Sequence, residues 1–202
     1  MRARVSSRAT EHEEAYLALV CRLGQLIESN DRYTYGHCER VAAYSVDIAR
    51  TLGFRGEELT TVRIGAYLHD LGKVAVPHEI LNKTGRLARE EIEVIRTHPV
   101  RGVELLAAIE FPWEIRPIIR WHHERYDGSG YPDGLCGDEI PISAQIIGIA
   151  DAYDALTTTR SYRQAVSPYE ALAEMGRTRR AWHPDVYGAF VATLTRESGR
   201  VA

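Results

Sequence analysis

The sequence predicts a fold built only from α-helices. Apolar residues recur at intervals of three and four along most of the chain, which is the spacing that puts them on one face of a helix. No segment alternates apolar and polar residues for more than a few positions, so no strand is expected. Glycine and proline residues separate the periodic segments, without an internal repeat or a low-complexity linker. These features favour an all-α domain with short connections.

The composition is that of one globular domain. The 202 residues are 45% hydrophobic and 26% charged, enough for one sizeable core. A net charge of −3 excludes a general attraction to DNA, RNA or an anionic membrane, so an anionic substrate would need a local group of cations. No run resembles a signal peptide or a membrane span. Three widely spaced cysteines, Cys21, Cys38 and Cys136, indicate reduced packing residues and a cytoplasmic location.

The N-terminus is a polar arm that leads into the first expected helix, over residues 11–29. Apolar residues such as Leu17, Val20 and Leu23 follow helical spacing there. This helix serves either the core or an interface between copies of the chain. We therefore assign residues 1–29 to an N-terminal arm and helix, acting as a connector or a dimerisation helix, and residues 30–202 to the main domain.

The next two expected helices each carry a histidine on their apolar stripe. The first stripe runs from His37 to Leu52, and the helix ends before Gly53. The second runs from Leu59 to His69. Because residues three or four apart share a helix face, both imidazoles are expected to face one interior.

The same pattern recurs in the helix expected over residues 89–97. Its inward residues are Ile92 and Ile95, and His98 follows in phase. Pro99 disrupts the helix directly after this histidine.

A short helix over residues 102–109 leads to another over residues 115–125. In the second one, His122 and His123 each follow an isoleucine by four positions, which is about one helical turn. The doublet therefore extends from an apolar face.

The remainder of the chain is a loop followed by three helices. Residues 126–135 are rich in glycine and proline and form a loop. Pro141 opens a helix that carries Asp151 and ends at a run of three threonines. Two amphipathic helices, over residues 168–179 and 185–194, complete the domain.

The residue types at these inward positions indicate a metal site. A lone histidine on an apolar face is usually a core residue, but burying five of them is costly because each imidazole needs partners for two nitrogens. Metal ions would supply those partners. The candidate ligands are His37, His69, Asp70, His98, His122, His123 and Asp151.

Five imidazoles and two carboxylates suit two six-coordinate metals better than one tetrahedral ion. Without a thiolate, the set favours iron or manganese, with zinc or nickel as alternatives. His12, in the polar arm, and His183, at a helix start, are left out of the set. His78, close after Lys73, stays open as a further ligand.

The ordered motifs resemble the HD-GYP domain, a subgroup of the HD metal-dependent phosphohydrolases found in bacterial signalling proteins. The resemblance covers residues 30–195 and is far more specific than one His-Asp pair. The matching segments are His69-Asp70-Leu71-Gly72-Lys73, His98-Pro99, His122-His123-Glu124, Asp127-Gly128-Ser129-Gly130-Tyr131-Pro132, Asp151-Ala152-Tyr153-Asp154-Ala155-Leu156 and Arg160-Ser161-Tyr162-Arg163.

This resemblance implies an HD-domain helical bundle with a GYP-containing loop and C-terminal helices. It also implies hydrolysis of cyclic di-GMP to pGpG, which some members continue to GMP. By the family pattern, one metal would be held by His37, His69, Asp70 and Asp151. Asp70 would bridge to a second metal held by His98, His122 and His123.

Asp70, as the bridging ligand, and Lys73 are the expected catalytic residues. Lys73 follows the aspartate by three residues, where it can contact the phosphate and stabilise charge in the transition state, and a solvated surface lysine is the alternative. Lys73, Arg160 and Arg163 would bind the substrate, since cationic side chains suit phosphate. A solvated basic turn is the alternative for the two arginines.

Two departures from the family pattern bear on the metal count. Tyr33 stands where members with three metals commonly carry glutamate, and His78 stands where aspartate is usual. Two metals are therefore expected. An alternative function is a weakly active or inactive regulatory module that binds a diguanylate cyclase, a sensor or a receiver domain, and a second is hydrolysis of another cyclic dinucleotide or nucleotide.

Overall fold

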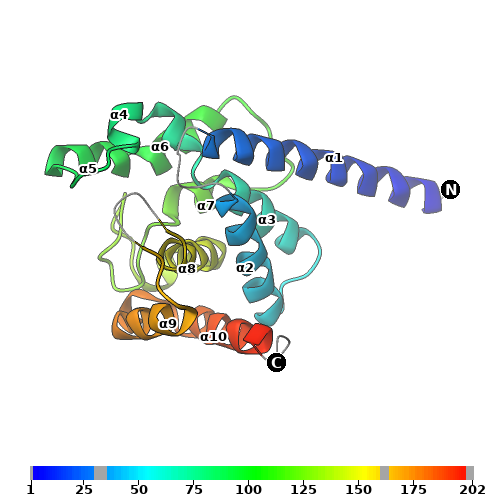
Figure 1. The fold of residues 1–202 in the computed structure, drawn as a ribbon. Helices are drawn as coiled ribbons and strands as arrows, with labels where there is room; N and C mark the ends of the chain where they lie inside the picture. Colours follow the sequence, from blue (N-terminus) through cyan, green and yellow to red (C-terminus); the bar gives the residue numbers. More distant parts are fainter. Residues whose placement is uncertain (1, 30–35, 160–163, 199–202) are drawn as a thin grey trace.

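The computed structural model describes residues 2–29, 36–159 and 164–198, with side chains from residue 15 to 196 within those ranges. These residues form helices and contain no strand, as expected (Figure 1). The α-helices are α1 (Arg2–Glu28), α2 (His37–Thr51), α3 (Glu57–Leu68), α4 (His78–Leu81), α5 (Arg89–Arg96), α6 (His98–Leu106), α7 (Arg116–Trp121), α8 (Ile142–Thr157), α9 (Pro168–Arg177) and α10 (Pro184–Ser198). Short 3-10 helices are η1 (Leu71–Ala75), η2 (Gly137–Glu139) and η3 (Arg179–Ala181).

Helix α8 forms the centre of the main core. It packs against α2, α3, α7, α9 and α10 (Figure 1). Its residues Ile146, Ile147 and Ile149 are fully buried, as are Val41 of α2 and Val62 of α3. Burial of an isoleucine side chain contributes about 1.5–3 kcal/mol, so this helix is held firmly at the middle of the domain.

A second apolar cluster lies beneath the C-terminal half of α1. Val20 and Ile27 of α1 pack there with Ile64 and Leu68 of α3 and with Ile119 of α7. The expected amphipathic face of this helix is thus confirmed. The helix begins at Arg2, however, so the expectation of a polar arm up to residue 10 was wrong. Three arginines and two alanines lie between residues 2 and 10, and the helix propensity of these residue types is high.

The end of α1 fixes the start of α2. The buried carboxylate of Glu28 accepts hydrogen bonds from the backbone amides of Gly36, at 2.9 Å, and of Cys38. These amides belong to the first turn of α2, where N–H groups have no partner within the helix. His37 lies between them, so α1 contributes directly to the placement of that histidine.

Two expectations for the middle of the chain were wrong. Ile92 of α5 was expected to face inward but is 39% exposed, because α5 lies at the edge of the molecule and buries none of its residues. Pro99 was expected to disrupt a helix, and α5 does end before it, at Arg96. Pro99 nevertheless lies within a helix, in the first turn of α6, which begins at His98. Proline is tolerated there because the first N–H groups of a helix have no internal partner.

Of the cysteines, Cys38 is buried, as a packing residue should be, whereas Cys136 is exposed, so its assignment to packing was wrong. Cys136 lies directly before η2, outside the apolar stripes. All three cysteines are free.

Candidate metal centre

The predicted ligands converge from the ends of separate helices. His37 is the first residue of α2, while His69 and Asp70 directly follow α3. His98 begins α6, and the histidine doublet follows α7. Two groups result, each with donor atoms within 4.8 Å of one another. One contains Asp70, His98, His122 and His123, and the other contains His37, His69 and Asp70.

Three of the histidines are oriented by the same local hydrogen bond, from the ring Nδ1 to a backbone carbonyl three residues earlier. Nδ1 of His69 lies 2.6 Å from the carbonyl oxygen of Ala66, three residues earlier, and Nδ1 of His98 and His122 make the equivalent contacts at 2.9 Å. A carbonyl oxygen can only accept, so Nδ1 carries the hydrogen. These carbonyls belong to the last turns of α3, α5 and α7, where carbonyl groups lack a partner within the helix.

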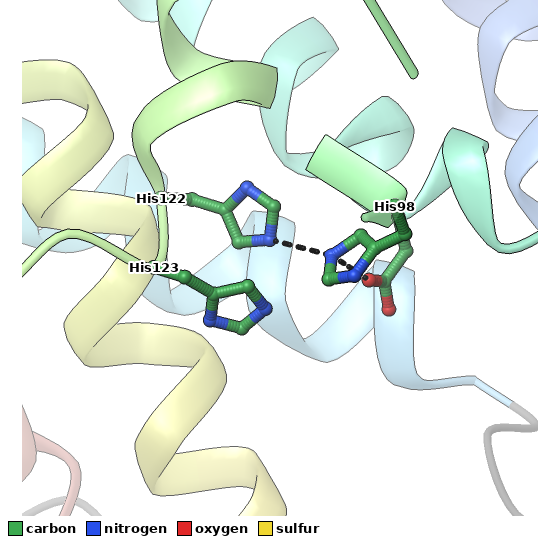
Figure 2. A group of neighbouring side chains, drawn as sticks. His98, His122 and His123 are labelled. Atoms are coloured by element: carbon green, nitrogen blue, oxygen red, sulfur yellow. Dashed lines mark hydrogen bonds and ion pairs between the residues drawn. The ribbon is translucent and has the colours of Figure 1, made fainter. Parts of the chain in front are cut away.

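The opposite ring nitrogens therefore present lone pairs to the interior. Nε2 of His37 lies 3.3 Å from Nε2 of His69, and Nε2 of His98 lies 3.3 Å from Nε2 of His122. Figure 2 shows His98, His122 and His123 gathered around one space. Two lone pairs at this distance repel each other unless a proton or a metal ion lies between them.

Asp70 presents one oxygen to each group. Its Oδ1 lies 3.3 Å from Nε2 of His98, while its Oδ2 lies 3.4 Å from Nε2 of His69 and 3.7 Å from Nε2 of His37. This division is what a carboxylate shared by two ions requires. Asp151 lies beside the second group, with Oδ1 3.5 Å from Nε2 of His37.

Burial favours the neutral form of three imidazoles, those of His98, His122 and His123. Burial, followed by the charge of nearby Lys73, lowers the pKa of His98 to about 4, although Asp70 opposes the shift. Burial and the neighbouring imidazoles likewise lower the pKa of His122 and of His123. Burial alone would raise the pKa of Asp70, but Lys73 and the histidines outweigh it and hold that pKa well below its ordinary value. Neutral imidazoles around an ionised carboxylate are the protonation states that bind a divalent metal, so these residues fit one.

A close backbone approach brings the two groups together. A Cβ atom on Gly72 would lie 1.8 Å from the carbonyl oxygen of His98, so only glycine allows η1 to lie against α6. A Cβ atom on Gly148 of α8 would lie 2.4 Å from the carbonyl oxygen of His122. These two glycines allow the turns that carry Asp70 and His122 to approach their neighbours.

The chain matches the sequence profile of the HD domain over residues 22–186. It belongs to the HD-domain family. This HD domain is 40% identical over 172 residues to the cyclic di-GMP phosphodiesterase response regulator RpfG of Xanthomonas campestris pv. campestris, covering 84% of this chain and 46% of that protein. It is 39% identical over 165 residues to the 3'3'-cGAMP-specific phosphodiesterase 2 of Vibrio cholerae, covering 79% of this chain and 32% of that protein. The chain thus spans less than half of either relative.

The fold agrees with a solved HD structure. A HDG"Y"P protein from Bdellovibrio bacteriovorus superposes with a TM-score of 0.65 at 23% identity, over 79% of this chain and 51% of that one. The expected HD-domain bundle and the resemblance to HD-GYP domains are therefore confirmed. No helix in the described part of this HD domain is long and apolar enough to cross a membrane.

Of the other residues that the sequence analysis singled out, some lie at the site and others do not. Lys73 lies at the site, with Nζ 2.5 Å from Oδ2 of Asp70. Arg160 and Arg163 fall outside the described residues, as does Tyr33. Among the described side chains, His78 is exposed at the start of α4 and joins neither donor group.

The loop that contains Gly130, Tyr131 and Pro132, called the GYP loop, borders one side of the site. The ring of Tyr131 stacks on that of His123, with centroids 4.8 Å apart and planes at 24°. The guanidinium of Arg96 lies 5.2 Å from the Tyr131 ring. Beyond this stack is a groove of about 360 Å³, bordered by α5, α6 and Pro132. Tyr131 therefore contacts a predicted ligand, His123.

The sequence reasoning missed Asp154. This buried carboxylate of α8 lies 2.7 Å from Nδ1 of His37 through Oδ2. It also accepts a hydrogen bond of 2.5 Å from Nε of Arg40. Its spacing of three residues from Asp151, on the same helix, was the available signal, because such residues share a face.

Proposed function

We propose that this HD domain is a two-metal phosphodiesterase that hydrolyses cyclic di-GMP to pGpG, with further cleavage to GMP as the alternative end point. The observation that carries the proposal is the pair of donor groups that share Asp70. A bridged pair of ions about 3.5–4 Å apart is a recurrent device for hydrolysing phosphate esters. The cyclic di-GMP phosphodiesterase relative, at 40% identity, supports this choice of substrate.

The proposed ligands follow the two groups. His37, His69, Asp70 and Asp151 would hold one ion, and Asp70, His98, His122 and His123 would hold the other. Iron or manganese suits these imidazole and carboxylate donors, with zinc and nickel as the alternatives. When bound, the ions would activate water and neutralise charge on the phosphate.

The residues of the chain prepare this site for an anionic substrate. Asp70 holds Lys73 at the rim by their ion pair, where the ammonium would meet a phosphate oxygen. A preorganised cation of this kind typically contributes about 10²–10³-fold to turnover. Arg160 and Arg163 would add guanidinium contacts to the phosphates and guanine edges of the substrate.

The second candidate substrate is 3'3'-cGAMP. Its support is the cGAMP-specific relative at 39% identity, almost equal to that of the cyclic di-GMP relative at 40%. Both substrates contain the same phosphodiester, and a metal centre reads phosphate rather than base.

The N-terminal residues 1–29 are proposed to serve as a connector or a dimerisation helix. Two leucines of α1 support this role, because Leu19 is 58% exposed and Leu26 is 64% exposed. They face away from the cluster formed by Val20 and Ile27.

The test is an anaerobic assay of the metal-reconstituted chain against a panel of cyclic dinucleotides, with the products separated by chromatography. Cleavage of cyclic di-GMP to pGpG is expected, and cleavage of 3'3'-cGAMP alone would favour the second candidate. Asp70→Ala should lose metal and at least about 100-fold in turnover. Asp47→Ala, at an exposed ion pair of α2, is the matched control. A metal-loaded wild type that cleaves no nucleotide would instead support a regulatory module.

A further inference from the structure

We propose that Asp154 is a positioning residue of the metal centre, which orients His37 and is itself held by Arg40. The inference rests on the proposed metal-dependent function. It concerns the histidine at the start of α2, whose Nδ1 contacts a carboxylate and not a backbone carbonyl of the kind that orients His69, His98 and His122.

His37 is the first residue of α2. The Nδ1 atoms of His69, His98 and His122 face backbone carbonyl oxygens, whereas Nδ1 of His37 faces a side chain. Asp154 supplies the acceptor, with Oδ2 2.7 Å from Nδ1 of His37. A carboxylate partner on Nδ1 fixes the tautomer that leaves the lone pair on Nε2, the nitrogen that faces His69.

Two carboxylates of α8 bracket the ring of His37. Asp151 approaches Nε2 at 3.5 Å, and Asp154 approaches Nδ1 at 2.7 Å. The two aspartates are three residues apart and so lie on one face of the helix. One of them is a proposed ligand, and the other faces the nitrogen that points away from the metal position.

Arg40 holds the carboxylate of Asp154 from the other side. Its Nε lies 2.5 Å from Oδ1, and its Nη2 lies 3.1 Å from Oδ2. This is the two-point contact that guanidinium makes with a carboxylate. Nη2 also reaches Oγ1 of Thr158, at 3.3 Å, which ties the pair to the C-terminal end of α8. Asp154 is 2% exposed, so its geometry is set by these partners rather than by water.

If the buried ion pair of Arg40 and Asp154 had only a structural role, a different result would be expected. Removing Asp154 would then lower the stability of the fold without a specific effect on His37. In the positioning role, removal also releases the ring of His37, and a lost partner of a ligating histidine typically costs about 10–100-fold in metal affinity.

The experiment measures the dissociation constant of Mn²⁺ under anaerobic conditions and the tautomer of His37 by ¹⁵N–¹H correlation in the metal-free chain. Asp154→Ala should weaken Mn²⁺ binding by about 10–100-fold and reduce the population of the Nδ1–H tautomer. Asp154→Asn keeps an acceptor without the charge, so its loss should be smaller. Asp47→Ala and Asp47→Asn, at the exposed pair with Arg50, are the matched controls and should change neither quantity.

Each outcome bears on one claim. Unchanged affinity and tautomer in a folded Asp154→Ala would overturn the positioning role. If that variant does not fold, the same result for Asp154→Leu, which fills the space without an acceptor, would do so. A wild type that binds no metal would refute the proposed function, while the tautomer measured without metal would still test the role of Asp154.

Discussion

The protonation state of single histidines links the fold to its pH dependence. His98 and His122 are buried and His123 is half-buried, and all three have a lowered pKa that favours the neutral ring. In the unfolded chain these rings titrate near the ordinary value of 6.5. Between that value and about 4, the unfolded state therefore binds protons that the folded state does not.

We expect the free energy of unfolding of the metal-free protein to fall as the pH decreases from 6.5 to about 4. Each such histidine contributes up to about 1.4 kcal/mol per pH unit within its window. Urea unfolding at stepped pH measures this slope. His98→Gln removes one titrating group and should make the slope shallower, whereas equal slopes for both proteins would contradict the buried neutral state.

Some residues of the site could be predicted from the sequence, and others could not. Helical spacing was enough to predict that His37 and His69 face one interior, because the apolar stripes of α2 and α3 that carry them are buried. His98 is also buried, although the stripe of α5 from which it was predicted is not. Helical spacing did not identify Asp154, because the spacing of three residues from Asp151 shows only that the two share a helix face and not which histidine Asp154 contacts. That contact joins residues 117 positions apart and depends on how α2 packs against α8.

At the scale of elements, the junction of η1 with α6 decides whether the donor groups meet. Gly72→Ala would put a Cβ atom 1.8 Å from the carbonyl oxygen of His98, so the two segments must separate. We expect a loss of about 2–3 kcal/mol in the free energy of unfolding, with a loss of bound metal. Denaturant titration and elemental analysis measure the two effects.

Gly188→Ala is the control for this variant. Gly188 lies within α10, and a Cβ atom there would have no neighbour within 4 Å. The substitution should be neutral or raise stability by about 0.5–1 kcal/mol, because alanine favours the helix. Equal behaviour of the two alanine variants would show that the contact at Gly72 can relax.

The elements that sequence reasoning found are those with a regular stripe. Helices α2, α3 and α8 are anchored by fully buried residues, and their existence was predicted. The short elements η1 and α4 were missed because they have only 5 and 4 residues, too few for a helical period to emerge. Ile92 was misjudged because periodicity shows which face of a helix is apolar but not whether another element covers it.

For the whole molecule, metal binding should act as a stabilising ligand. The donors come from the ends of α2, α3, α6 and α7, so an ion joins segments that separate on unfolding. At a free-metal concentration 100 times the dissociation constant, one site contributes about 2.7 kcal/mol. For a chain of this size, that corresponds to a rise in melting temperature of about 5–10 °C.

We therefore expect chelation to lower the melting temperature by this amount and Mn²⁺ to restore it. Differential scanning calorimetry before and after chelation measures the shift. Asp70→Ala, which lacks the shared carboxylate, should melt at the same temperature with and without Mn²⁺. A wild type insensitive to both treatments would argue against a metal that bridges the helices.

The two oxygens of Asp70 also limit how this centre can diverge. Since Oδ1 lies by the group of His98 and Oδ2 by that of His69, one side chain would set the surroundings of both ions in the proposed two-metal centre. A substitution that changed the metal preference of one position would then also alter the other. In that centre, the two metal positions would have to change their preference together, unless a different residue replaced one of the two carboxylate oxygens.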